Sequence, residues 1–186
     1  MQATAGQSTT LNTRRIVISG VLGAIAILLG WTRIGYIPVP NLAANATIMH
    51  IPAIIGGVME GWLVGAIIGG LFGLSSFALA TVPLFKNPIV AILPRLLIGV
   101  TAYFSYAAFR KSNEYLALVI AAIVGTLTNT ILVLGLAGIF NYIPWVAMPP
   151  ILLTNALPEV IIAIILVVAV VVAWKRIETG GGQAKM

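Results

Sequence analysis

The stretch that decides the fold class is residues 151–174, ILLTNALPEVIIAIILVVAVVVAW. A helix needs about 20 mostly apolar residues to cross the ~30 Å hydrocarbon core of a bilayer, because it rises about 1.5 Å per residue. Residues 151–174 meet that length and contain one ionisable side chain, that of Glu159. The stretch therefore predicts a transmembrane helix that holds a carboxyl group inside the membrane.

The composition of the whole chain points the same way. Of the 186 residues, 60% are hydrophobic and 8% are charged, and the mean hydropathy is +1.10. Soluble domains carry about 25% charged residues, and a water-soluble fold of this size could not bury so much apolar surface. The bilayer is thus the expected solvent for most of the chain.

Five further apolar stretches precede residues 151–174, giving expected spans at 16–31, 44–59, 62–80, 88–109, 114–136 and 151–174. Only Glu60 and Gly61 separate the second span from the third, which predicts a tight turn between antiparallel neighbours. We expect an all-α membrane protein: a single bundle of six transmembrane helices over residues 14–176, with flexible ends at 1–13 and 177–186. Five spans is the alternative if residues 44–61 form one re-entrant element.

The distribution of positive charge predicts the orientation. With six spans both termini share a side, and the opposite side holds only Arg33 and Lys86. The side of the termini collects Arg14, Arg15, Arg110, Lys111, Lys175, Arg176 and Lys185. Cytoplasmic loops are enriched in Lys and Arg, so both termini are expected in the cytoplasm and the protein is expected to be a multi-pass protein of the plasma membrane. The net charge of +6 then reflects topology and not nucleic-acid binding.

The chain has few side chains of the types that form catalytic and metal-binding sites. Cysteine is absent, and one histidine and four glutamates are too few for a typical multi-ligand metal site. The chain also lacks the Gly-x-x-x-x-Gly-Lys-Ser/Thr loop that binds ATP phosphates and any recognisable nucleophile motif. We therefore expect no enzyme activity, cofactor or metal, and any energy for transport must come from a partner or an ion gradient.

Four polar side chains are expected at a similar depth in the membrane. Ionisable groups in hydrocarbon cost several kcal/mol, so each needs an explanation. Counted along their spans, His50, Arg95, Asn129 and Glu159 all fall roughly 9–12 Å below the outer surface. This layer predicts a cavity that opens outward. The alternatives are a structural ion pair between Arg95 and Glu159, hydrogen bonding between helices by Asn129, and a buried histidine with a backbone partner.

Prolines and aromatic residues accompany this layer. Pro52, Pro94 and Pro158 lie next to the polar positions, and each frees a backbone carbonyl one turn earlier. Aromatic residues of the outer loops can clamp an organic ligand or can serve as interfacial anchors. The candidate substrate-binding residues are Arg95, Asn129, Glu159, His50, Tyr36, Trp145 and Asn155.

Small residues form stripes on two of the expected helices. Gly61, Gly65, Gly69 and Gly73 are spaced for close helix packing, and internal packing is sufficient to explain them. The stripe of Gly20, Gly23 and Ala24 in the first helix could instead be a docking face for another membrane subunit.

At these residues the chain resembles the substrate-binding S components of energy-coupling factor (ECF) vitamin transporters, and most closely the pantothenate-type subgroup. The resembling segments are Ala46–Pro52, Gly61–Leu74, Leu93–Arg95, Thr128–Gly135 and the helix of Glu159, and together they cover about Asn12 to Trp174.

The resemblance implies high-affinity capture of a water-soluble vitamin or precursor, with pantothenate the best guess, from outside for ATP-driven uptake. It implies that Arg95 meets a ligand carboxylate, and that a membrane coupling (T) subunit and two ATPase subunits are partners. Gly20-x-x-x-Ala24 then matches, approximately, the family's Ala-x-x-x-Ala docking motif. The alternative is a stand-alone proton-coupled secondary transporter of a small organic solute, with Glu159 and His50 as a proton relay.

Overall fold

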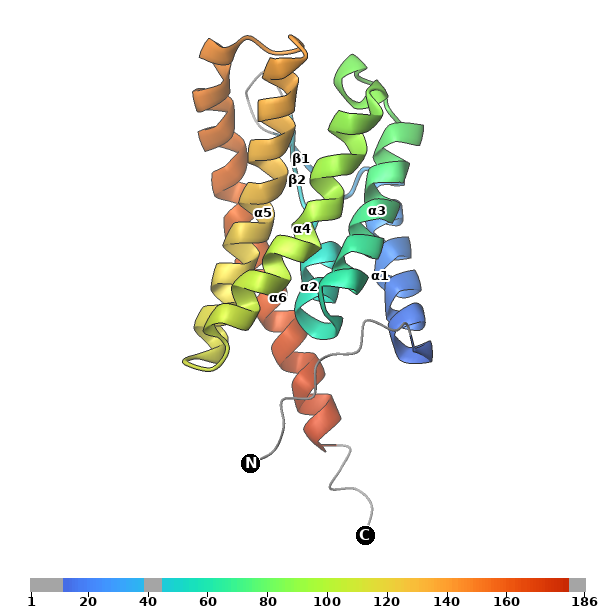
Figure 1. Ribbon diagram of the computed structural model, residues 1–186, viewed down its shortest axis with the longest axis vertical. Helices are drawn as coiled ribbons and strands as arrows, with labels where there is room; N and C mark the ends of the chain where they lie inside the picture. The colour runs from blue at the N-terminus through green and yellow to red at the C-terminus, as the bar shows by residue number, and fades with distance from the viewer. Residues whose placement is uncertain (1–11, 39–44, 181–186) are drawn as a thin grey trace.

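The computed structural model describes residues 12–38 and 45–180 of the chain (Figure 1). Its elements, in order, are α1 (Thr13–Trp31), β1 (Tyr36–Pro38), β2 (Asn45–Thr47), α2 (Ile51–Glu60), α3 (Trp62–Ala78), the 3₁₀ helix η1 (Pro83–Lys86), α4 (Pro88–Phe109), α5 (Glu114–Ile139), the 3₁₀ helix η2 (Trp145–Ala147) and α6 (Met148–Gly180). The described part of the chain thus holds six α-helices, which confirms the predicted all-α class.

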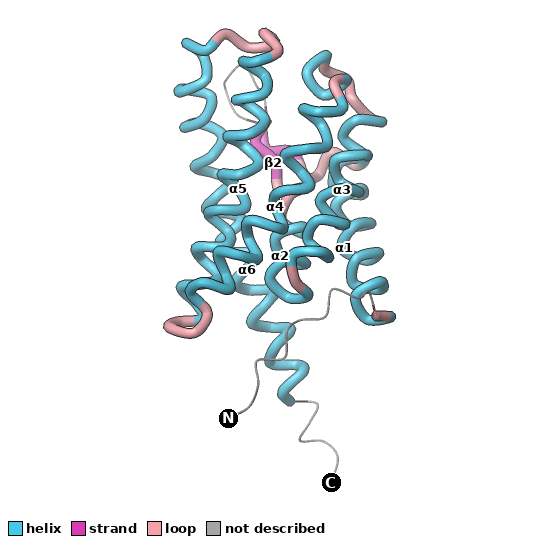
Figure 2. The backbone as a smooth tube through the Cα atoms, in the orientation of Figure 1, coloured by secondary structure: helices cyan, strands magenta, loops and turns pink. Residues whose placement is uncertain are grey.

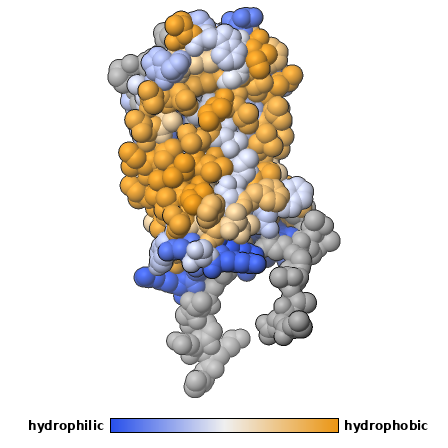
Figure 3. Space-filling model, turned by 60° about the vertical axis from the view of Figure 1, so that its left-hand side comes forward, coloured by the Kyte–Doolittle hydropathy of each residue, from blue (hydrophilic) through white to orange (hydrophobic). Residues whose placement is uncertain are grey.

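The helices run along the long axis of the molecule, and α1 begins at the same end at which α6 finishes, the lower end in Figure 1. Four of the described helices, α1, α4, α5 and α6, are long and apolar enough to cross a membrane, whereas α2 and α3 are shorter. Figure 3 shows apolar side chains over most of the height of one face, with hydrophilic residues gathered towards the two ends. This pattern is typical of a protein whose middle faces lipid.

The expected helix at 44–59 is wrong over residues 45–50, and residue 44 lies outside the described residues. Residues 45–47 form β2, which pairs antiparallel with β1 in the register Tyr36↔Thr47, Ile37↔Ala46 and Pro38↔Asn45. The helix begins only at Ile51, with Pro52 in its first turn, a position that proline tolerates because the first turn lacks hydrogen-bond partners anyway. Figure 2 shows the two strands between the helices in the upper half of the bundle. As a result His50 lies at the N-terminus of α2 instead of inside a helix.

The tight turn predicted between the second and third helices is confirmed. Gly61 joins α2 to α3 with a φ of 104°, a conformation that side chains with a Cβ rarely adopt. Beside the turn, the largely buried Glu60 carboxylate forms an ion pair with Arg14, with 2.9 Å between Arg14 Nε and Glu60 Oε1. This contact ties the start of α1 to the α2–α3 turn.

The glycines of α3 pack against other helices, as the internal-packing interpretation predicts. A Cβ added to Gly65 would lie 2.8 Å from the Cα atoms of both Gly57 in α2 and Gly99 in α4. Further along α3, a Cβ on Gly69 would collide with the carbonyl oxygen of Arg95, and one on Gly73 would lie 2.9 Å from the Cα of Ile92. The absence of side chains therefore lets the backbones of α2, α3 and α4 approach closely.

Replacing Gly65 with alanine is expected to destabilise the protein by about 1–3 kcal/mol, because the new methyl group meets backbone atoms on two sides. The matched control is Gly135→Ala in α5, where an added Cβ has no neighbour within 4 Å; alanine there should be neutral or stabilise by up to ~1 kcal/mol. Thermal unfolding of the detergent-purified variants measures both. Equal midpoints for the two variants would contradict close packing at Gly65.

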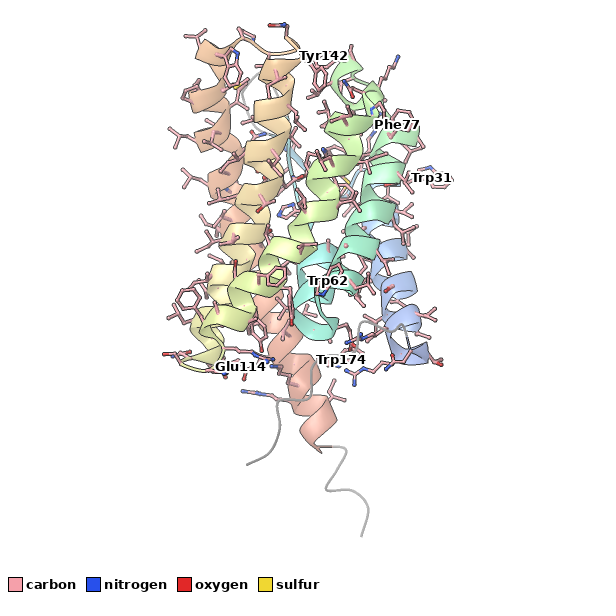
Figure 4. The ribbon with its side chains drawn as sticks, in the orientation of Figure 1. Trp31, Trp62, Phe77, Glu114, Tyr142 and Trp174 are labelled. Atoms are coloured by element: carbon pink, nitrogen blue, oxygen red, sulfur yellow. The ribbon has the colours of Figure 1, made fainter. Side chains whose placement is uncertain are left out.

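At the lower end of the bundle, Tyr106, Glu114 and Lys175 connect three helices. The Tyr106 hydroxyl donates to the Glu114 carboxylate (3.2 Å), and Lys175 Nζ donates to the Tyr106 hydroxyl (2.9 Å) and forms an ion pair with Glu114. Figure 4 shows Glu114, Trp62 and Trp174 near this end, and Tyr142 near the other. Polar and aromatic groups thus mark both ends of the apolar belt.

The predicted domain limits are partly outside the described residues. Most of the predicted N-terminal segment (1–11) and the last residues of the C-terminal segment (181–186) are not described. The helix α6 continues to Gly180, so residues 177–180, predicted to be flexible, are helical. Lys175, Arg176 and Glu178 are good helix formers that extend a long helix beyond its apolar stretch.

Candidate functional site

Glu159 lies at the centre of the polar layer, on α6. Its side chain is 3% exposed, and its two oxygens accept from two different elements. Oε1 accepts from the backbone N–H of Thr47 in β2 at 2.6 Å, and Oε2 accepts from the Thr130 hydroxyl in α5 at 3.0 Å. One carboxylate therefore joins the hairpin to two helices.

His50 lies next to this group, at the N-terminus of α2. It is fully buried, and its Nε2 is 3.0 Å from the hydroxyl oxygen of Thr126 in α5. Thr126, Asn129 and Thr130 are all buried and share one face of α5, because residues three and four positions apart lie on the same side of a helix. These three residues make this buried face of α5 polar.

Arg95 approaches from α4, and the sequence explains its position. Pro94 has no N–H, so the carbonyl of Val90, one turn earlier, loses its helical partner. The buried Arg95 guanidinium donates to that carbonyl through Nη1 at 2.8 Å. The guanidinium also lies over the rings of Phe85 in η1 (4.6 Å to the centroid) and Phe72 in α3 (5.5 Å), in the range of cation–π attraction.

The structural ion pair between Arg95 and Glu159, which was the alternative interpretation of these residues, is not formed. Neither group has an ion-pair partner among the residues that the structure describes. Arg95 is nevertheless close enough to interact electrostatically with Glu159, His50 and Tyr36. A cation and a carboxylate thus lie near each other in the interior without neutralising each other directly.

Among the described residues, three buried polar atoms of the cluster formed by His50, Arg95, Asn129 and Glu159 have no hydrogen-bond partner: His50 Nδ1, Arg95 Nε and Asn129 Oδ1. Buried polar groups are almost always paired, and each exception needs an explanation. Two of these three atoms are nitrogens, of His50 at the start of α2 and of Arg95 in α4. The third is the side-chain oxygen of Asn129 in α5, which is an acceptor. Such a set can bind a small polar molecule that carries both acceptors and donors.

The other three predicted substrate-binding residues do not all lie near this cluster. Tyr36, in β1, lies near Arg95, and Asn155 is buried on α6 one turn before Glu159. Trp145, in η2, is 61% exposed, and its ring packs over Gly138. Within the described residues no hydrogen bond joins Trp145 to the polar cluster.

Sequence reasoning did not select several residues that complete the cluster. These are Thr47, Phe72, Thr126 and Thr130. The signal for the two α5 threonines was available, since they flank Asn129 at helical spacing. The contribution of Thr47 is a backbone N–H, which no side-chain pattern reveals.

The stripe predicted for docking on α1 divides into two sets. Gly20 and Ala24 are exposed on the outer surface of the helix, and a Cβ on Gly20 would have no neighbour within 4 Å. Gly23 is buried, and a Cβ there would lie 2.6 Å from Leu71 Cδ1 of α3. Gly23 therefore packs inside the protein, and Gly20 and Ala24 remain open to a partner.

Comparison with known proteins bears on the use of this site. Residues 14–171 match the family described as "ECF transporter, substrate-specific component". The pantothenic acid transporter PanT of Lactococcus lactis subsp. cremoris (strain MG1363) is 37% identical, over 70% of this chain and 78% of that protein. A solved structure, described as that of the S component of a bacterial ECF transporter, superposes with a TM-score of 0.58 at 21% identity, covering 91% of this chain and 98% of the other. The last match shows a shared fold.

Proposed function

Because the chain belongs to the substrate-specific (S) components of ECF transporters, we propose that it captures a water-soluble vitamin or precursor, with pantothenate the best candidate, outside the cell. Its role is in transport and not in catalysis. In this proposal it is a multi-pass protein of the plasma membrane with both termini in the cytoplasm, and it binds its substrate with high affinity for ATP-driven uptake.

The observation that supports this function best is the buried Arg95, which within the described residues has no ion-pair partner and an unpaired Nε, together with the unpaired His50 Nδ1 and Asn129 Oδ1. Pantothenate carries a carboxylate at one end, and an amide and hydroxyl groups along the rest. Its carboxylate complements the Arg95 guanidinium, which can offer two parallel N–H donors. The 37% identical pantothenic acid transporter is consistent with the same ligand.

Energy must be supplied by other subunits in this proposal. The chain has no Gly-x-x-x-x-Gly-Lys-Ser/Thr loop for nucleotide phosphates, so a membrane coupling subunit and two ATPase subunits provide the driving force. The exposed Gly20 and Ala24 on α1 are the proposed contact for the coupling subunit, because small residues let a second helix approach closely.

Native mass spectrometry of the detergent-purified protein tests the capture role, combined with calorimetric titration of pantothenate and other water-soluble vitamins. A co-purified or titrated pantothenate with a submicromolar Kd is expected. Tight binding of a different vitamin would keep the S-component role but replace the ligand. Failure to bind any vitamin in the panel would contradict the proposal.

Glu159→Gln is expected to weaken pantothenate binding about 10-fold. A carboxylate offers roughly four acceptor sites, and Thr47 and Thr130 use two of them, so the others can accept from ligand hydroxyls. Glutamine keeps an acceptor for Thr47 but loses the charge and half of the acceptor capacity. The measurement is the Kd by calorimetry. Unchanged binding together with abolished uptake would instead indicate a proton relay through Glu159.

A further inference from the structure

The contact between His50 and Thr126 determines more than the position of the histidine ring. Both side chains are fully buried. Among the described residues, the hydroxyl of Thr126 has one hydrogen-bond partner, His50 Nε2 at 3.0 Å. Its neighbour Thr128 behaves differently, since its hydroxyl donates to the carbonyl of Val124, one turn earlier. The donor of Thr126 is therefore available to the imidazole.

This arrangement selects one tautomer. A buried imidazole beside the Arg95 guanidinium holds a single ring proton, because a second would place two like charges together inside the bilayer. If that proton were on Nε2, it would donate to Thr126 and the threonine's own proton would be left buried without an acceptor. A proton on Nδ1 lets the threonine hydroxyl donate to Nε2, so that among the described residues only the Nδ1–H donor is left without a partner.

We propose that Thr126 is a positioning residue that holds His50 in its Nδ1–H form, so that Nδ1–H donates to an acceptor at the anionic end of the bound substrate, beside Arg95. This inference rests on the proposed function and specifies how the same site distinguishes its ligands. His50 Nδ1 is buried and has no hydrogen-bond partner among the described residues, and Arg95, which is proposed above to meet the ligand carboxylate, is close enough to interact electrostatically with His50. The α2–α4 side of the site then offers only donors, and selects a carboxylate over a cationic or donor-only group.

Two pairs of variants separate this role from a purely structural one. In His50→Asn the amide nitrogen can occupy the place of Nδ1, whereas in His50→Gln it reaches the place of Nε2. Asparagine is therefore expected to bind pantothenate within about 3-fold of the unmodified protein, and glutamine at least about 10-fold more weakly. Thr126→Val, which removes the hydroxyl at constant shape, is expected to weaken binding about 5- to 10-fold, and Thr126→Ser is expected to restore it.

The tautomer itself can be observed, because His50 is the only histidine in the chain. Nitrogen NMR of protein labelled with ¹⁵N-histidine identifies the ring nitrogen that carries the proton, with and without pantothenate. We expect Nδ1–H in the unmodified protein, a shift of the Nδ1 resonance when pantothenate binds, and partial conversion to Nε2–H in Thr126→Val.

The outcomes distinguish this inference from the proposed function. A proton on Nε2 in the unmodified protein overturns the inference even if pantothenate binds tightly, and leaves the capture role intact. Equal losses of affinity in His50→Asn and His50→Gln, in variants with unchanged unfolding midpoints, also overturn it. A protein that binds no vitamin contradicts the proposed function, and the NMR experiment still decides the tautomer.

Discussion

Replacing Arg95 with alanine is expected to weaken pantothenate binding about 100-fold or more. Truncating one partner of a buried, hydrogen-bonded charge pair costs about 2–5 kcal/mol, much of it because the other charge stays buried without a partner. Within the described residues Arg95 has no carboxylate partner that could substitute for the ligand. Calorimetric titration of the purified variant measures the loss directly.

The matched control is Arg95→Lys, which keeps the charge but not the planar pair of donors. Lysine should recover part of the affinity but remain at least about 10-fold weaker, because a point charge does not reproduce bidentate binding of a carboxylate. Removing Arg95 also frees the Val90 carbonyl, so the unfolding midpoint of each variant must be compared. Unchanged affinity in a folded Arg95→Ala protein would show that the guanidinium serves only to satisfy that carbonyl.

The sequence predicted the helices well where the hydropathy signal was long. The starts of α4 and α5, at Pro88 and Glu114, agree with the prediction because an N-cap asparagine precedes each, Asn87 and Asn113. The failure at residues 45–50 has a different origin. Pairing of β1 with β2 depends on contacts between separate segments, and a three-residue strand carries too little periodicity to be recognised.

From the sequence alone, candidate site residues could be selected only where burying a polar or ionisable side chain in the membrane costs free energy. Arg95, Glu159 and His50 were selected as candidates because polar or ionisable groups in a membrane need partners. Phe72, which lies under the Arg95 guanidinium, has no such cost in hydrocarbon and gives no signal. The sequence pattern of Trp145 does not distinguish two roles, because an aromatic residue in an outer loop can cover a ligand or anchor the protein at the membrane interface; in the structure it is exposed and packs on Gly138.

Replacing Ala24 or Gly20 with leucine is expected to abolish vitamin uptake in cells while leaving the Kd of the purified protein unchanged within about 2-fold. Both positions are exposed on α1, and an added side chain at Gly20 meets nothing within the chain. A partner helix that packs against small residues would be pushed away by several ångströms, and close packing is the main source of helix association in lipid. Uptake of labelled pantothenate and co-purification of the coupling subunit are the two measurements.

The contrast with two other glycines makes this result specific. Gly135→Leu adds the same bulk on α5, where a Cβ also has open space, and should leave uptake intact. Gly23→Leu should lower the unfolding midpoint, because it would collide with Leu71 inside the protein. Loss of uptake in the Gly20 and Ala24 variants alone, with binding retained, would separate capture of the vitamin from coupling to the ATPases. Normal uptake in all of them would place the coupling subunit on another face of the bundle.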